Sequence, residues 1–451
     1  MELMDDRNVF MALGEAPTSN FQRILFNSNE ASVTEFQESR IRIPHSENTY
    51  IDTSASYLSF DVVHNIVGTG LNAGDGVHFS ASGASAYISS LQVYQNGRLV
   101  NDFPSYDKIC AMLNASNVGY GNRSGGSVSQ GLPTDNRNTG DGLIIGQSGA
   151  ATTKQYVGEY SLNLLGIMGD VSKNLPLGLM TGDIEIVVRW AGPTNAIYTN
   201  AKSADQTIST SLTSYVASNI NYNAKVITVS PQENEAIRRN SMDDQGIMSW
   251  SSIMCRMDSQ FNIPAAVLST DTNLSNILAG FRYASLRSIG ACGFNTNNND
   301  NSNCKTSPYI YMNNRDAIQY SVGGIYFPQI PITNASQITA ETNINFSSSS
   351  QAGVNNSFSK GLVGYSRRML DGADDNITTQ KSRGVSIVNL QDSYISGNAG
   401  LNTKAIQVVA NSNISPIADQ TANTYNMTAM FFPFFDCIYS INKEGYLSSS
   451  W

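Results

Sequence analysis

The chain has three histidines, which are the first residues to consider for metal or acid–base chemistry. His45, His64 and His78 match no zinc-binding spacing, and none has a cysteine nearby in the sequence. His64 and His78 could meet across a hairpin, but isolated histidines in strands are usually ordinary core or surface residues. We therefore predict no metal-binding role for them.

Two loop-like segments invite a ligand-binding interpretation. Residues 68–76 (GTGLNAGDG) contain paired glycines, but the residues that follow do not begin a helix, so a hairpin loop with an Asp-Gly turn is favoured over a phosphate cradle. Residues 371–376 (DGADDN) lack the alternating spacing and distal Glu of a calcium loop, which favours a solvated turn. The aspartates considered for calcium are Asp271, Asp300, Asp371, Asp374 and Asp375.

Motifs for covalent or phosphoryl chemistry are missing from the sequence. It has no Gly-x-Ser-x-Gly elbow and no Gly-rich loop ending in Gly-Lys-Ser/Thr. Paired carboxylates of a glycosidase cannot be located from sequence in a β protein, so that alternative stays open. We predict that the chain is not an enzyme and has no catalytic, cofactor-binding or metal-binding residues.

The cysteines indicate reduced thiols more than a disulfide framework. They are five in number, an odd count, are scattered without a Cys-x-x-Cys pair, and stand at 110, 255, 292, 304 and 437. Cys292 and Cys304 lie on either side of a polar loop, so a disulfide between them remains an alternative.

Composition excludes several classes of protein. The 451 residues are 41% hydrophobic, enough for a sizeable core, but only 14% are charged and the net charge is −9. Soluble chains typically contain about 25% charged residues. High apolar content argues against disorder, scarce helix formers argue against a coiled coil, and the absence of basic blocks argues against a protein that coats nucleic acid. Large β proteins with uncharged polar surfaces are the class that fits.

Signals for export and membrane insertion are weak. Residues 1–20 carry Asp5 and Asp6 where a secretory signal needs basic and then apolar residues. No run approaches the ~18 apolar residues of a transmembrane helix. We expect no secretory signal and no membrane-spanning helix.

Short strands bounded by turn residues dominate the local pattern. Residues 56–63 (SYLSFDVV) alternate polar and apolar side chains, the period of a half-buried strand. Strands are also predicted in the first half at 40–44, 86–94, 156–164, 183–190 and 222–229. In the second half they are predicted at 246–257, 282–290, 308–312, 317–322, 384–390, 404–410 and 426–441.

Helices are few, and aromatic residues concentrate near the end of the chain. Helices are predicted at 104–113 and at 231–240, where acidic residues come first and arginines last. Residues 431–435 (FFPFF) would aggregate if fully exposed, so we predict that they lie in the core or at a subunit interface. Trp190, Trp250 and Trp451 fall in strand patterns or at the terminus.

The chain divides into two similar halves of about 220 residues. Polar, charged residues 231–244 separate two runs of strands, and long uncharged loops interrupt both runs. Many short strands without strand–helix alternation predict sandwiches or barrels.

The order of these segments resembles the double jelly-roll major capsid proteins of tailless icosahedral dsDNA viruses. That lineage includes adenovirus hexon and the capsid proteins of algal viruses, virophages and polinton-like viruses. The closest similarity is at 175–190 (LPLGLMTGDIEIVVRW), an apolar strand late in the first half. Further similar segments are residues 21–44 with 56–63, 89–113, 219–239, 320–332 and 430–445.

The resemblance implies an all-β fold of two consecutive eight-stranded jelly rolls, with a few short helices and long loops. It divides the chain into an N-terminal arm (1–24), a first jelly roll (25–232), a linker helix (233–244) and a second jelly roll (245–451). Three chains would then form a pseudo-hexagonal tile. The loops implied for turrets or trimer contacts are 119–155, 192–215, 294–307 and 345–380.

The same resemblance implies the partners and the location. The chain would form a homotrimer, contact neighbouring trimers in the shell, and meet penton and minor capsid proteins. The arm is expected to pack under a neighbour, with contact to an inner membrane as the alternative. We expect a virion location, no cofactor and no sequence-specific nucleic-acid binding. Other readings are a secreted carbohydrate-binding or carbohydrate-active β-sandwich and a viral spike or penton protein.

Overall fold

The computed structural model places most of the chain's strands and helices. It describes residues 20–69, 76–79, 82–117, 129–131, 143–144, 152–169, 174–193, 195–200, 209–263, 277–279, 282–295, 318–333, 337–338, 340–342, 385–390, 400–405, 408–412 and 427–451. The predicted strand 308–312, the aspartates 371–376 and the loop 345–380 lie outside these residues.

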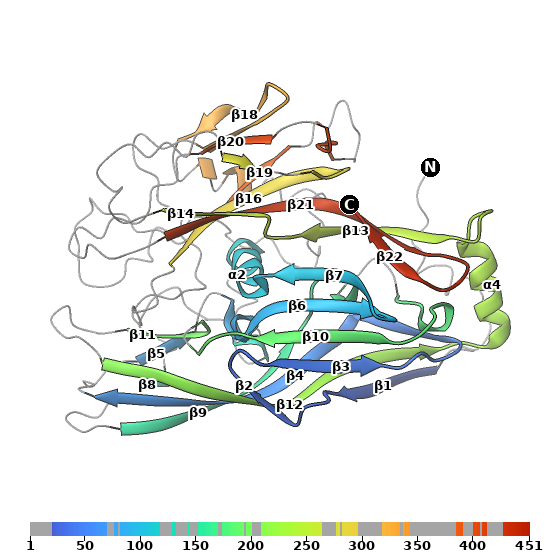
Figure 1. Cartoon of the computed structure of the whole chain (residues 1–451), viewed down its shortest axis with the longest axis horizontal. Helices are drawn as coiled ribbons and strands as arrows, with labels where there is room; N and C mark the ends of the chain where they lie inside the picture. The colour runs from blue at the N-terminus through green and yellow to red at the C-terminus, as the bar shows by residue number, and fades with distance from the viewer. Residues whose placement is uncertain are drawn as a thin grey trace.

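The N-terminal half, residues 20–228, is built from antiparallel sheets (Figure 1). The outermost sheet has the order β1-β12-β4-β9, with β2 beside β12; the strands are β1 (Asn20–Asn27), β2 (Ser32–Thr34), β4 (Thr49–Thr69), β9 (Thr152–Leu162) and β12 (Ser209–Thr228). The second sheet has the order β3-β10-β6-β7, with β3 (Glu38–Ile43), β6 (Ile88–Gln95), β7 (Arg98–Pro104) and β10 (Ile184–Trp190). A small third sheet joins β5 (Gly76–Phe79), β8 (Leu143–Ile144) and β11 (Ile197–Asn200).

Alternating side chains pack the two main sheets of this half against each other. Strand β3 is buried at every second residue, so Ile41 and Ile43 enter the core while Arg40 and Arg42 face solvent. Phe60 from β4 meets Trp190 from β10 edge-on, with ring centroids 5.1 Å apart. This alternation is what a sheet needs when one face packs on another sheet.

The C-terminal half, residues 248–450, repeats this layering. One sheet has the order β13-β21-β16-β19 and also pairs β14 and β22 with β21; its strands are β13 (Met248–Cys255), β14 (Ser259–Ile263), β16 (Leu286–Asn295), β19 (Ser386–Asn389), β21 (Met427–Ile441) and β22 (Leu447–Ser450). The other has the order β15-β20-β17-β18, with β15 (Ile277–Ala279), β17 (Ile318–Val322), β18 (Ile325–Ile332) and β20 (Val408–Ser412). In the described strands, pairing never crosses from one half to the other.

Strand β21 explains the aromatic run that ends the sequence. Phe431, Phe432, Phe434 and Phe435 are all buried, at 0–1% exposure. Neighbouring residues of a strand face opposite sides, so both faces of β21 must be covered. Tyr320 of β17 packs on Phe431 from one side, which confirms the core alternative of the prediction for this segment.

Helices occupy the ends and the middle of the molecule. The α-helices of the described residues are α2 (Tyr106–Asn117) and α4 (Pro231–Ser241). The 3-10 turns there are η1 (Gly83–Tyr87), η2 (Gly166–Gly169) and η3 (Leu177–Leu179). Ser230 and Glu233 form a capping box at the start of α4, and Pro231 occupies its first turn. This is the helix predicted at 231–240, and it starts two residues before the predicted linker 233–244. None of the described helices is long and apolar enough to cross a membrane.

Two strands are much longer than the sequence predicted. Strand β4 has 21 residues and β12 has 20, more than twice the lengths predicted at 56–63 and 222–229. Their pairing is interrupted by register shifts such as the one between Ser218 and Asn221, where Asn219 has a φ of 51°. Bulges of this kind bend a strand without ending it, and their polar residues resemble turns in the sequence. The predicted loops 119–155 and 192–215 therefore include the starts of β9 and β12.

Candidate assembly interface

The two halves meet along a seam between β7 and β22. The Ser449 hydroxyl donates to the carbonyl of Val100 at 2.6 Å, and the Leu447 amide donates to the Gln95 side-chain oxygen at 3.3 Å. The Arg98 guanidinium lies over the ring of Tyr446, 4.4 Å from its centroid. The last strand of the chain therefore covers the open edge of the N-terminal sheet, which removes an edge that could aggregate.

A buried polar group links the halves behind this edge. Asn101 of β7 and Tyr439 of β21 exchange hydrogen bonds of 3.0 and 3.1 Å between the side-chain amide and the phenol hydroxyl. The amide of Ile167 also donates to Asn101, at 2.9 Å. Both side chains are buried, so neither can replace the other with water as its partner. These hydrogen bonds therefore fix the relative position of the halves.

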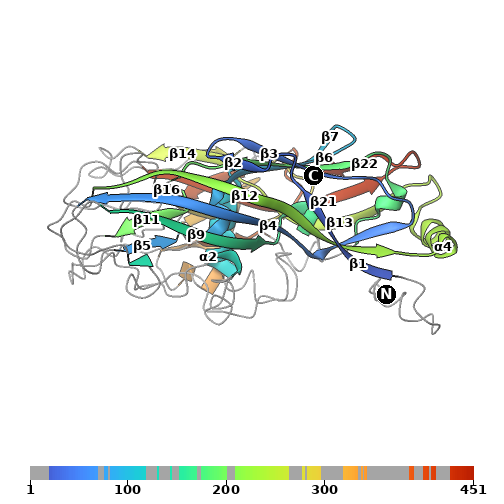
Figure 2. The same ribbon diagram turned by 90° about the horizontal axis from the view of Figure 1, so that it is seen from below.

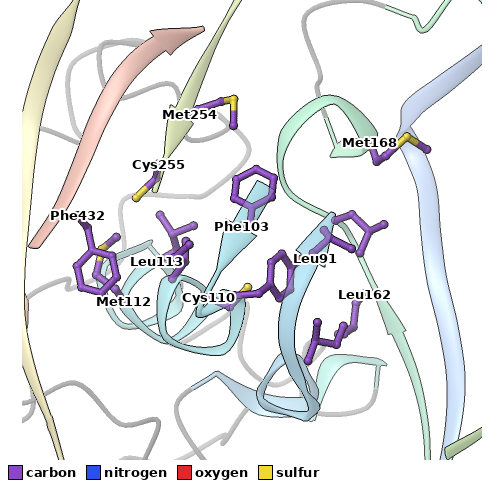
Figure 3. Close-up of a cluster of buried hydrophobic side chains, with 14 of the residues drawn as sticks. Leu91, Phe103, Cys110, Met112, Leu113, Leu162, Met168, Met254, Cys255 and Phe432 are labelled. Atoms are coloured by element: carbon purple, nitrogen blue, oxygen red, sulfur yellow. The ribbon is translucent and has the colours of Figure 1, made fainter. Parts of the chain in front are cut away.

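Apolar packing completes the seam (Figure 3). Cys110 and Leu113 of α2, with Phe103 of β7, belong to the same buried cluster as Cys255 of β13 and Phe432 of β21. Because this cluster is continuous with the core of each half, the halves behave as one packed unit.

A second contact between the halves lies close to α4. Thr181 donates through its amide to Gly445 at 2.9 Å and through its hydroxyl to Glu444 at 2.6 Å. Gly445 has a φ of +81°, and a Cβ there would meet the Thr181 amide nitrogen at 2.7 Å. Only glycine fits this turn without displacing the neighbouring backbone. Asn234 of α4 accepts a 2.7 Å hydrogen bond from Tyr50, so the helix is fixed to the N-terminal half.

The β1-β12-β4-β9 sheet forms the side of the molecule that faces the viewer in Figure 2, and its outward face carries several exposed apolar side chains. Phe21, Leu25 and Val157 are 56%, 59% and 62% exposed on it. Val157 lies opposite Val63, which in turn lies opposite Val216, so three valines cross this face in one row. Solvated sheet faces normally carry polar side chains at such positions, so the row indicates a contact surface.

The opposite side of the molecule carries a second apolar feature, strand β18 (Figure 1). Ile325, Tyr326 and Ile330 are 61%, 48% and 76% exposed there. The strand forms an edge of its sheet and contains Pro328 and Pro331, which cannot donate to a further strand. Its side chains are therefore available for contact while its backbone does not favour open-ended sheet growth.

The histidines do not come together. His45 lies in the loop before β4, where a ring nitrogen is 3.1 Å from the carbonyl of Leu177. His64 belongs to β4 and His78 to β5, which are strands of different sheets, so the hairpin contact considered from the sequence does not form. In the described part of the chain, no group of three or more His, Cys, Asp and Glu side chains is arranged to hold a metal ion.

The described cysteines are free. Cys110, Cys255, Cys292 and Cys437 are buried thiols, and burial raises the pKa of Cys110 to about 12. Cys292 forms no disulfide, and its proposed partner Cys304 lies outside the described residues. Buried neutral thiols of this kind are poor nucleophiles.

Two buried titratable groups of the N-terminal half have strongly shifted pKa values. Burial lowers the pKa of His64 to about 4; its ring packs beside the rings of Tyr87 and Tyr215, and its Nε2 has no hydrogen-bond partner. Burial raises the pKa of Asp107, at the start of α2, to about 6, and Asn195 donates to it at 3.1 Å. Sequence alone gave no sign of Asp107, because its burial depends on how α2 packs.

Comparison with solved structures gives matches over nearly the whole chain. The crystal structure of the mavirus major capsid protein matches 95% of this chain and 90% of its own, with a TM-score of 0.51 at 10% identity. The Faustovirus major capsid protein matches 94% of this chain and 90% of its own, with a TM-score of 0.53 at 9% identity. The chain has the double jelly-roll fold of viral major capsid proteins.

The same fold is found in PBCV-1 VP54, in a structure fitted into a reconstruction of the virophage Sputnik. It matches 96% of this chain and 97% of its own, with a TM-score of 0.54 at 11% identity. No protein-family model and no curated protein matches the chain. The double jelly-roll resemblance noted from the sequence is thus confirmed at the level of the fold, and it concerns backbone arrangement far more than residue identity.

The seam between the two jelly rolls gives a first prediction. Replacing Tyr439 with Phe removes the hydroxyl that bonds to Asn101 and should lower the free energy of unfolding by about 1–3 kcal/mol, because a buried amide loses one of its hydrogen-bond partners. Tyr446→Phe is the matched control: it keeps the ring that Arg98 covers and should change stability by less than about 0.5 kcal/mol. Urea unfolding followed by tryptophan fluorescence measures both; equal effects would contradict this role for Tyr439.

The pKa of His64 gives a second prediction. Because the folded protein takes up this proton only near pH 4, the unfolded chain binds more protons between pH 6.5 and 4, and stability falls as the pH falls. Wild type should lose about 3 kcal/mol more than His64→Phe over this range. Unfolding free energies measured in urea at pH 7, 5.5 and 4.2 test this, and parallel profiles for the two proteins would disprove it.

Asp107 should have the opposite effect. Because the pKa of Asp107 is raised in the folded protein, the folded protein binds more protons than the unfolded chain between about pH 4 and pH 6. The free energy of unfolding therefore falls as the pH rises through this range. Asp107→Asn keeps an acceptor for Asn195 and should be more stable than wild type by about 3 kcal/mol at pH 7. The advantage should vanish near pH 4 in the same urea series; an advantage independent of pH would contradict the assignment.

Proposed function

We propose that the chain is the major capsid protein of a tailless icosahedral dsDNA virus. The observation that carries this proposal is the double jelly-roll fold itself, shared over 94–96% of the chain with the capsid proteins compared above. Three chains form a trimer, and their six jelly rolls make a pseudo-hexagonal tile. Tiles then meet along their sides to form the shell.

The placement of the two apolar surfaces supports a head-to-tail trimer. The valine row lies on the outer face of the N-terminal half and β18 lies on the far side of the C-terminal half (Figure 1). Contact between different surfaces of identical chains is heterologous, and it closes into a ring when the rotation per chain fits. Low overall charge limits the desolvation cost when such broad walls meet.

The division of the chain follows from this proposal. Residues 1–24 form the N-terminal arm, 25–232 the first jelly roll, 233–244 the linker and 245–451 the second jelly roll. Sheets that do not mix strands from the two halves support this division. Strand β1 includes the last residues of the arm, Asn20 to Ile24, and pairs them with β12.

A position in the capsid shell also determines the other partners of the protein. The protein acts in the virion as a structural component and not as an enzyme, and it contacts penton and minor capsid proteins. A net charge of −9 supports a wall that leaves genome neutralisation to other components and does not read nucleic-acid sequence. Fully buried Trp190 offers no platform for a sugar ring, so nothing favours the carbohydrate-binding alternative.

Charged substitutions on the two apolar surfaces test the proposal. Wild type should sediment at three times 48.7 kDa at micromolar concentration. Val157→Glu or Ile330→Glu should weaken association at least tenfold and release monomer, because an unpaired charge becomes buried in the contact.

Gln245→Glu is the matched control for these variants. It adds the same charge at an exposed position near α4, away from both surfaces, and should leave the trimer intact. Sedimentation velocity measures all four proteins. A monomeric wild type, or trimers that resist both surface substitutions, would contradict the proposal.

A further inference from the structure

A groove of about 410 Å³ opens at the end of the molecule where both halves meet α4. Its walls come from residues 45–48 and 178–182 of the N-terminal half, the inner side of α4, and residues 443–445 between β21 and β22. The hydrogen bonds from Thr181 to the 443–445 turn and from Asn234 to Asn48, the latter 2.9 Å long, fix these walls relative to one another.

The lining of the groove combines a few apolar side chains with many polar and charged ones. Met180 is nearly fully buried, and Leu179 and Met242 are partly buried beside it. Arg238 and Lys443 are exposed, and neither has an ion-pair partner among the described residues. The exposed side chains of His45, Glu47 and Glu444 complete the titratable groups of the rim.

The segment that precedes β1 leaves the fold close to this groove. Asn20 pairs with Thr228, which pairs in turn with Thr49, the neighbour of the groove residue Asn48. Two strand spacings correspond to about 10 Å. Seven residues, 13–19, can span up to about 23 Å, so residues 1–12 can reach the groove without strain.

The sequence of that segment is complementary to the groove. Leu3 and Met4 are apolar, and they are suited to pack against the leucine and methionine side chains of the lining. Asp5 and Asp6 match the unpaired Arg238 and Lys443, and Arg7 matches the carboxylates of the rim.

We propose that residues 3–7 of the chain dock in this groove of their own subunit. The segment would then contact both halves and α4 at once. Tethering makes the local concentration of the segment high, which favours its own groove over that of another subunit. The proposal does not depend on the capsid function: it concerns a contact within one chain.

Cysteine cross-linking in the full-length chain tests this docking. Asp6→Cys combined with Arg238→Cys should form a disulfide when diamide accepts the two electrons and two protons of the thiols. Asp6→Cys with Arg239→Cys is the matched control, because Arg239 is on the same helix but does not line the groove. We expect at least tenfold more cross-linked peptide from the first pair, measured by mass spectrometry.

Isotope mixing and charge exchange decide the remaining alternatives. In a mixture of ¹⁵N-labelled and unlabelled subunits, the cross-linked peptide should be of one label only; mixed-label peptides would overturn docking in the same subunit. In a chain that keeps Arg238, Asp5→Lys with Asp6→Lys should increase chymotrypsin cleavage within residues 1–19 at least fivefold, and adding Arg238→Glu and Lys443→Glu should restore protection. Equal cross-linking at 238 and 239, or no rescue, would also overturn it.

Discussion

The structure depends on one constraint, the fixed seam between its two halves. Neither half closes its own sheets completely: β7 has an open edge until β22 covers it, and β21 needs cover on both faces. The buried pair of Asn101 and Tyr439 adds direction to a contact that is otherwise apolar. A polar pair that is satisfied only in one arrangement disfavours sliding of the halves.

The rigid seam fixes the positions of the two exposed apolar surfaces relative to each other. A valine row on one side and the exposed side chains of β18 on the other can face successive neighbours only if the distance and angle between them are constant. Low charge, which in the sequence only excluded classes of protein, then fits walls that are buried repeatedly against copies of the same chain.

Sequence reasoning predicted the parts of the fold that depend on local pattern. Alternation identified the strands around Ile41, Leu91 and Ile186, and the order of charges, acidic residues first and arginines last, identified α4, because neighbouring residues determine both signals. It missed the continuity of β4 and β12, since bulges look like turns, and it missed the seam entirely. Tyr439 is over 300 residues from Asn101, and Thr181 is over 250 residues from Gly445, and no local pattern records such contacts.

The central claim is that one chain supplies two rigidly joined jelly rolls to a tile of three chains. Single-particle electron microscopy of the purified protein tests it most directly. Class averages should show three-fold symmetry and six lobes of similar size around a ring. Each chain should supply two adjacent lobes, and the remaining junctions between lobes should be contacts between chains. Class averages dominated by isolated two-lobed particles, or by rings with other symmetry, would contradict it.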